Sequence, residues 1–203
     1  MSSHAIYTIG HSNHTIEHFI DLLKMHGVEV VADVRSVPVS SRHPQFNRDA
    51  LKAALTSAGM KYLFLGKELG ARRSEREAYE GQIASYERIA GLPVFREGLD
   101  RVRKGAESYR VALMCAEKDP LDCHRTLLVC RYLRDTITGS IRHILADGSL
   151  EAHEQTERRL VADMGMNADQ AEMFSDQSEP TLERAYRKRG LKIAYQEEAS
   201  VAD

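Results

Sequence analysis

The first 150 residues of the chain alternate between two patterns of apolar positions. Short, nearly continuous apolar runs are typical of buried strands, and longer segments with apolar residues three or four positions apart are typical of amphipathic helices. The short runs predict strands at residues 5–9, 28–34, 61–65, 111–114 and 141–145. The longer segments predict helices between these strands.

Signals for helix ends agree with this division. Thr15 and Asn47 are expected N-caps because their side chains can accept a hydrogen bond from the first turn. Gly27 and Gly59 are expected to end the same two helices. Residues 75–91 are polar and poorly patterned, and we expect them to be helical. A second possibility is that this segment forms a mobile lid.

Strands that alternate with helices imply right-handed βαβ units and a parallel sheet. We therefore predict an α/β fold with three layers, α/β/α, around a mainly parallel Rossmann-like or flavodoxin-like sheet of about five strands whose order stays open. Beyond the fifth strand the pattern predicts only helices, at residues 151–164 and from 181 to about 198, on either side of an acidic loop. Residues 1–150 are expected to form the α/β domain and 151–203 a helical extension packed on it, in a single structural domain.

Composition narrows the class of protein. Hydrophobic residues make up 42% of the 203 residues and charged residues 29%, as in ordinary globular proteins. No apolar run is long enough to cross a bilayer and the N-terminus does not look like a signal peptide, so we expect a cytoplasmic protein without membrane association. A net charge of −2 gives no global sign of nucleic-acid binding, which stays possible, and the oligomeric state stays open.

Candidate chemistry gathers where the predicted strands end. The segment 110–130 reads as strand, polar loop and helix, and it carries Cys115, Glu117, Asp119, Cys123, His124 and Arg125. The carboxyl ends of parallel strands share one edge of a sheet, where ligands bind. We therefore predict a polar cleft at this edge, to which the other turns and the long connection after the second strand contribute Gly10, His11, Ser12, Asp33, Arg35, Arg42, Gly70 and His143.

These residue types favour an enzyme that binds an anionic, phosphate-bearing or nucleotide-like small molecule. A helix N-terminus and arginine forks attract anions, and a cysteine in such a field is expected to have a lowered pKa. The catalytic candidates are a nucleophile, Cys115 or Cys123, a base, His124 or His11, and two orienting acids, Glu117 and Asp33. The ligand-binding candidates are Gly10, Ser12, Arg35, Arg42, Gly70, Asp119, Arg125 and His143. The sequence does not indicate which cofactor the protein uses, if it uses one.

Other interpretations use the same residues. Zinc could be held by Cys115, Cys123 and His124 with His11 or His143, although close ligand pairs such as C-x2-C are missing. The two cysteines could also form a redox disulfide. A phosphatase-like anion loop would need an arginine six positions after its cysteine, whereas Arg125 follows Cys115 by ten.

Two simpler interpretations remain. Cys115 could be a small packing residue, with His124 and Arg125 serving only as a helix cap and a salt bridge. A non-catalytic module for nucleotides or nucleic acid is the other alternative, since the last predicted helix carries a basic face that is also typical of a solvated surface: Arg184, Arg187, Lys188, Arg189 and Lys192.

The motifs resemble those of the domain of unknown function 488 family. The segments that carry the resemblance are YTIGHSN, TIEHFIDLL, VVADVRSVPVSSRHPQFN, KYLFLGKELGA and VALMCAEKDPLDCHR, with HILADGSLEAH and AYRKRGLKIAY further on. The resemblance implies an α/β protein of a kind found widely in bacteria, with no settled activity. It covers nearly the whole chain, and CAEKDPxxCHR is its most specific part. His18 departs from it, because an acid is expected at that position of the first helix.

Overall fold

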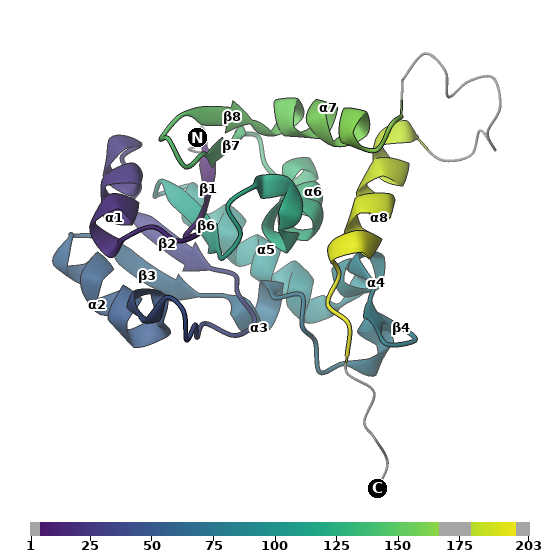
Figure 1. Cartoon of the computed structure of the whole chain (residues 1–203), viewed down its shortest axis with the longest axis horizontal. Helices are drawn as coiled ribbons and strands as arrows, with labels where there is room; N and C mark the ends of the chain where they lie inside the picture. The colour runs from purple at the N-terminus through teal and green to yellow at the C-terminus, as the bar shows by residue number, and fades with distance from the viewer. Residues whose placement is uncertain (1–4, 167–179, 198–203) are drawn as a thin grey trace, which may run out of the picture.

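The computed structural model describes residues 5–166 and 180–197. A six-stranded sheet in the order β3-β2-β6-β1-β7-β8 forms its centre (Figure 1). The strands are β1 (Ile6–Gly10), β2 (Val30–Asp33), β3 (Lys61–Phe64), β6 (Val111–Cys115), β7 (Ile141–Ile144) and β8 (Leu150–Ala152). The first five are parallel, whereas β8 runs antiparallel to β7.

Alternate strand residues face two separate apolar cores. Val111, Leu113 and Cys115 face one core, and Ala112 and Met114 face the other. This period of two is the geometry of a pleated strand buried on both faces. It explains why β6 is apolar at every position, and it places the Cys115 side chain on a defined side of the sheet.

Helices cover both faces of the sheet, which confirms the predicted three-layer α/β/α fold (Figure 1). Two helices, α1 (Ile16–Met25) and α2 (Arg48–Ser57), pack on one face. The other face is covered by α3 (Gly66–Leu69), α4 (Tyr86–Gly91), α5 (Pro93–Ala106), α6 (Arg131–Leu133), α7 (His153–Asp163) and α8 (Thr181–Ile193). Thr15 caps α1 as expected, because its side chain accepts a hydrogen bond from the His18 backbone N–H.

The chain leaves the centre of the sheet in both directions. From β1 it passes to β2 and β3 on one side, and from β6 it crosses β1 to reach β7 on the other. Open α/β sheets bind ligands beyond the strand ends at such a switch point. The turns that follow the central strands therefore border the region where a cleft was predicted.

Four local predictions were wrong. Asn47 stands before α2, but its side chain does not cap the helix, because its Oδ1 accepts from the Ser40 N–H at 2.6 Å. Residues 75–91 are not one helix, because a 3-10 turn and the hairpin of β4 (Tyr79–Glu80) and β5 (Ile83–Ala84) precede α4. The three residues of β8 were expected to belong to a loop and a helix start. The last helix ends at Ile193 rather than near residue 198, which itself lies outside the described residues.

Long-range pairing explains two of these differences. The Ala84 N–H donates to the Tyr195 carbonyl at 2.9 Å, and the Glu197 N–H donates to the Gln82 carbonyl at 2.9 Å. Residues 194–197 are thus extended against the hairpin instead of continuing α8. Such partners, more than 100 positions apart, leave no local pattern in the sequence.

The C-terminal helices pack against the rest of the chain. Buried Arg131 of α6 donates to Glu183 of α8 at 2.6 Å and to Glu87 of α4 at 2.8 Å. Figure 1 shows α8 along the side of the molecule away from α1 and α2. The predicted division after residue 150 stays a prediction, although β8 spans that boundary. Most of the acidic loop predicted between residues 164 and 181 lies outside the described residues, namely 167–179.

Within the described parts of the chain, no helix has both the length and the apolar character that a membrane crossing requires.

Candidate functional site

A cavity of about 690 Å³ lies beyond the ends of β1, β2 and β6. Its walls come from segments that are far apart in the sequence. They are His11, Ser12 and Asn13 after β1; Arg35, Ser36, Val37, Val39, Ser40, Arg42 and His43 after β2; Cys115, Ala116, Glu117 and Lys118 after β6; and Ala71, Arg72, Tyr86, Asp122, His124, Ile193 and Tyr195. The structure thus brings His11, Arg35 and Cys115 to one cavity.

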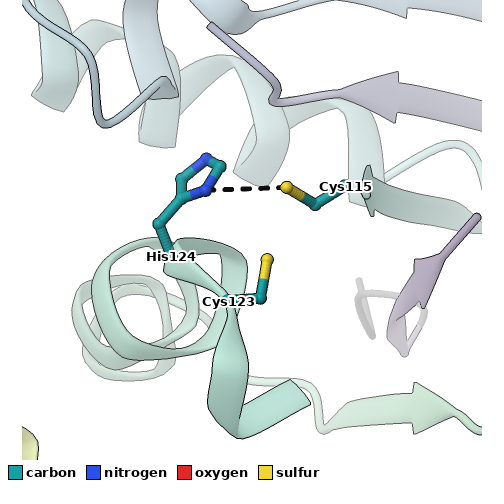
Figure 2. Close-up of side chains that lie close together, drawn as sticks. All are labelled: Cys115, Cys123 and His124. Atoms are coloured by element: carbon teal, nitrogen blue, oxygen red, sulfur yellow. Dashed lines mark hydrogen bonds between the residues drawn. The ribbon is translucent and has the colours of Figure 1, made fainter. Parts of the chain in front are cut away.

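Two cysteines and a histidine form a compact cluster at this cavity (Figure 2). Cys115 ends β6, and Cys123 and His124 stand directly before a π-helical segment, Arg125–Cys130. The two Sγ atoms and a His124 ring nitrogen all lie within 4.8 Å of one another. Cys115 is 3% exposed and lines the cavity, whereas Cys123 is 1% exposed and does not, so a small molecule in the cavity meets the cluster at Cys115.

The hydrogen bonds of His124 fix its tautomer. Its Nε2 lies 3.0 Å from the Val34 carbonyl oxygen, which can only accept, so Nε2 carries the proton. In the neutral ring Nδ1 is then an acceptor, and it lies 3.6 Å from Cys115 Sγ. The imidazole is therefore held with a basic nitrogen toward the thiol.

Charges around the cysteines separate their pKa values. Burial opposes ionisation of Cys123, but the hydrogen bond from Cys115 and the positive charge of Arg125 outweigh it and lower the pKa. Burial raises the pKa of Cys115, and the neighbouring Cys123 raises it further. The Arg125 backbone N–H also donates to Cys123 Sγ at 3.4 Å. Ionisation is therefore favoured at Cys123 and opposed at Cys115.

The two candidate bases, His124 and His11, also have pKa values that are shifted in opposite directions. Burial opposes protonation of His124, but its hydrogen bond with Cys123 and the charge of that sulfur raise the pKa. Burial lowers the pKa of His11 to about 4, and its ring stacks on Phe46 with 4.4 Å between ring centroids. Because a base should have a pKa near the working pH, His124 suits that role better than His11.

Asp33 positions an arginine rather than a histidine. The fully buried carboxylate accepts from Arg35 Nε at 2.9 Å and Nη2 at 2.7 Å, and the Tyr62 hydroxyl donates to it at 2.8 Å. Arg35 Nη2 also donates to the Phe46 carbonyl at 2.8 Å. The paired Arg35 is thus fixed in the cavity wall.

Arg125, a predicted ligand-binding residue, lies in the interior instead of the cavity wall. Its side chain is fully buried. Nη1 donates to the Glu117 carbonyl at 2.7 Å and Nη2 to the Lys118 carbonyl at 3.2 Å. The guanidinium therefore fixes the loop after β6, and its charge acts on the cysteines without contact with the cavity.

Four other predicted ligand-binding residues are also absent from the cavity wall. Gly10 lies under the Glu117 carbonyl, and Gly70 donates its N–H to the Gly66 carbonyl at 3.1 Å. Asp119 accepts from Arg159 at 2.9 and 3.1 Å. His143 is fully buried in the core.

Glu117 stays at the cavity, at its exposed rim. Partial removal from water and the nearby Cys123 raise the pKa of its carboxyl. Ser12 and Arg42, both predicted to bind a ligand, also line the cavity. Ser12 has a φ of 48°, a left-handed conformation that is uncommon outside glycine.

Sequence reasoning missed the far wall of the cavity. Tyr195 was not among the predicted site residues, but its ring lies in the wall with the Arg72 guanidinium 4.7 Å from its centroid. Tyr86 and Lys118 also went unmarked. Lys118 is inside the cysteine motif and could have been found there, whereas Tyr195 reaches the site only through its pairing with the hairpin.

A comparison with protein families bears on this site. The sequence profile of the family described as "Domain of unknown function DUF488" matches residues 15–132, more than half of the chain. The chain belongs to the DUF488 family. No curated protein matches it. The profile spans Cys115, Cys123 and His124, and the family expected from the motifs is thereby confirmed.

One comparison with solved structures concerns a DUF442 protein of Shewanella putrefaciens CN-32, described as a candidate phosphatase. The sequence identity is 15%, and the alignment covers 93% of this DUF488 chain and 87% of the other. The TM-score of 0.32 is too low for the likeness to support any conclusion.

Replacement of Gly10 tests how tightly the loop after β6 is held. A Cβ at this position would lie 1.8 Å from the Glu117 carbonyl oxygen. We expect Gly10→Ala to lower the free energy of unfolding by about 1–3 kcal/mol, as for other overpacked sites, measured by urea denaturation. Gly91→Ala is the matched control, since a Cβ there has no described atom within 4 Å apart from its chain neighbours and the backbone of its own helix. Equal stability of the two variants would contradict this packing.

Proposed function

We propose that this DUF488 protein is an enzyme that binds an anionic small molecule in the cavity. The Cys115 sulfur forms a bond to an electrophilic atom of this molecule, while a leaving group departs from that atom with the electron pair of the broken bond and can take the proton that His124 has accepted. His124 acts as the base. The observation that carries the proposal is the position of His124 between the thiol and a backbone carbonyl. Its Nδ1 lies 3.6 Å from Cys115 Sγ, and its Nε2 lies 3.0 Å from the Val34 carbonyl oxygen. A nucleophile, a base and a group that orients the base form the recurrent arrangement of nucleophilic catalysis.

Proton transfer along this line leaves each hydrogen bond intact. When His124 Nδ1 takes the Cys115 proton, the imidazolium donates from Nε2 to the Val34 carbonyl and from Nδ1 to the new thiolate. The sulfur of Cys123, whose pKa is lowered, is a second acceptor for the same proton when it is ionised. Two acceptors therefore compensate for the burial that otherwise opposes a thiolate at Cys115.

Position distinguishes the two cysteines. Cys115 lines the cavity, whereas Cys123 lies behind it and accepts from the Arg125 backbone N–H. Cys115 is therefore the proposed nucleophile, and the role of Cys123 is to take up a proton from it, since a negative charge that stays on Cys123 raises the pKa of Cys115. Cys130 is fully buried in the core and takes no part.

The charge of the cavity wall supports an anionic ligand. Among the described residues its cations are Arg35, Arg42, Arg72 and Lys118, and its acids are Glu117 and Asp122. Asp122 pairs with Arg189 and Arg35 pairs with Asp33. The cations at the exposed rim, Arg42, Arg72 and Lys118, thus outweigh the one remaining acid. Such a wall favours phosphate or carboxylate groups.

The phosphatase-like alternative is less well supported. That chemistry uses an arginine beside the nucleophile to hold the transferred anion. Arg125 donates to two carbonyl groups of the protein and does not line the cavity.

Alkylation with iodoacetamide tests the thiol proposal. In metal-free protein we expect Cys115 to be labelled, because proton transfer to His124 or Cys123 forms some thiolate at Cys115 below the ordinary cysteine pKa of about 8.5. The rate should fall as the pH drops through the lowered pKa of Cys123, because both sulfur atoms are protonated below it. His124→Asn removes the nearby base and should move this profile upward by about one pH unit or more. Mass spectrometry identifies the labelled residue and gives the rates.

His18→Asn is the matched control, since this exposed ring lies on α1 and outside the cavity wall. Its profile should equal that of the unmodified chain. An ordinary cysteine profile in the unmodified protein, or no labelling of Cys115 at any pH, would end the thiol proposal.

Protection by inorganic phosphate tests the anion site. Phosphate in the cavity should slow alkylation of Cys115, because it occupies the route to the thiol. Arg42→Gln should raise the phosphate concentration needed for half protection about tenfold, because the variant loses one charge-assisted hydrogen bond to the anion. Arg103→Gln on α5, where the arginine pairs with Asp100 and Glu107, should leave it unchanged. Equal protection in both variants would remove Arg42 from the site.

A zinc site is a second candidate, favoured by the cluster of Cys115, Cys123 and His124 ligand atoms. Tetrahedral zinc with bonds of about 2.3 Å to sulfur and about 2.1 Å to nitrogen places those ligands about 3.6 Å apart, and the Cys115 Sγ to His124 Nδ1 distance is 3.6 Å. The Val34 carbonyl would orient the histidine, as outer partners of metal ligands do. His11 and His143 do not join the cluster.

Elemental analysis separates the two candidates. Bound zinc would appear near one atom per chain, would suppress alkylation of Cys115, and would be lost in Cys123→Ser but retained in Cys130→Ser. Zinc-free protein that fails to take up zinc during dialysis excludes the metal site and leaves the thiol proposal standing.

A further inference from the structure

A line of buried hydrogen bonds crosses the core behind the cysteine cluster. Thr8 Oγ1 of β1 lies 2.8 Å from His143 Nδ1 of β7, and His143 Nε2 lies 3.0 Å from His153 Nδ1 of α7. All three side chains are 2% exposed or less. The cavity does not include them, so the proposed reaction leaves two buried histidines unexplained.

The line continues in both directions. At one end His153 Nε2 lies 3.2 Å from the Tyr186 hydroxyl, which donates to Glu157 Oε1 at 2.8 Å. At the other end Arg125 Nε donates to Thr8 Oγ1 at 3.3 Å. One series of contacts thus joins a buried cation beside the cysteines to a carboxylate on α7.

The chemistry of the Glu157 end fixes the direction of every bond. The carboxylate also accepts from Arg134, and as an ionised acid it can only accept. Tyr186 must therefore give its proton to Glu157 and accept from His153 Nε2–H. Burial, the largest contribution at both rings, lowers the pKa of His153 and of His143, so each neutral ring has one donor and one acceptor.

The proton positions of His143 and Thr8 follow from that of His153. With its proton on Nε2, His153 accepts at Nδ1, so the proton of His143 is also on Nε2. His143 then accepts at Nδ1, and the Thr8 hydroxyl must donate to it. The Thr8 oxygen keeps its lone pairs for Arg125 Nε–H. Each residue donates toward Glu157, and no donor faces another donor.

We propose that Thr8, His143, His153, Tyr186 and Glu157 form a one-way hydrogen-bond chain that positions the Arg125 guanidinium beside the cysteine pair. Bonds that point in one direction polarise one another, so the charge of Glu157 strengthens the Thr8 oxygen as an acceptor. Arg125 in turn holds the carbonyls of Glu117 and Lys118 at the cavity. These are positioning residues, and their relevance to catalysis rests on the proposed function.

Nitrogen NMR on the full-length, metal-free protein tests the chain directly. At neutral pH both His143 and His153 should be neutral with the proton on Nε2, and Arg125 Nε–H should exchange slowly with solvent. A proton on Nδ1 of either ring, or a cationic ring, would overturn the assigned direction. This measurement needs no variant and no activity, so its failure is distinct from failure of the thiol proposal.

Two variants test transmission along the chain. Thr8→Val removes the link next to Arg125, and His153→Phe breaks the chain two links further away. Both should accelerate exchange of Arg125 Nε–H by about tenfold or more, the effect of weakening one hydrogen bond to a charged group. Acceleration in Thr8→Val with no change in His153→Phe would overturn the proposal, because it would show a local contact only.

Thr126→Val is the matched control for loss of a buried hydroxyl. Thr126 is 1% exposed, and its Oγ1 has no hydrogen-bond partner among the described residues. This variant should leave the Arg125 signal unchanged, and Thr8→Ser should restore slow exchange because it restores the hydroxyl. An equal effect of Thr126→Val and Thr8→Val would also count against the chain, as it would indicate general loosening.

Discussion

The buried guanidinium of Arg125 is the constraint on which the rest of the site depends. A charge removed from water is costly unless hydrogen bonds compensate it, and Arg125 finds its acceptors in Thr8 and in the carbonyls of Glu117 and Lys118. Satisfaction of the charge therefore requires one conformation of the loop after β6. That conformation closes the loop over Gly10, and the backbone can approach so closely because glycine has no Cβ.

The parallel register of β1 and β6 supplies the second half of the arrangement. Gly10 pairs with Cys115, and the pairing continues where the His11 and Ser12 N–H groups donate to the Cys115 and Ala116 carbonyls at 2.9 and 2.8 Å. The two turns are thus joined before either reaches the cavity. The π-helical segment that follows begins at Arg125. Such segments are rare in proteins as a whole, and those that occur often lie at functional sites.

The sequence allowed much of this architecture to be predicted, for identifiable reasons. The strands are short apolar runs, and parallel strands share an edge, so the meeting of His11, Arg35 and Cys115 at one cavity followed from the pattern. The direction in which a polar side chain points did not follow. Arg125 and His143 are as polar as Arg42, but a partner on another strand or loop draws them inward, and no local pattern records such a partner.

The walls of the cavity have separate origins along the chain. The cysteine cluster lies within the stretch that the family profile matches, whereas Ile193 and Tyr195 lie beyond its end at residue 132. Substitutions at these two positions change the shape and polarity of the cavity while the cluster stays the same. Two proteins with an identical CAEKDPLDCHR motif can therefore differ in the far wall of the cavity, at positions 193 and 195.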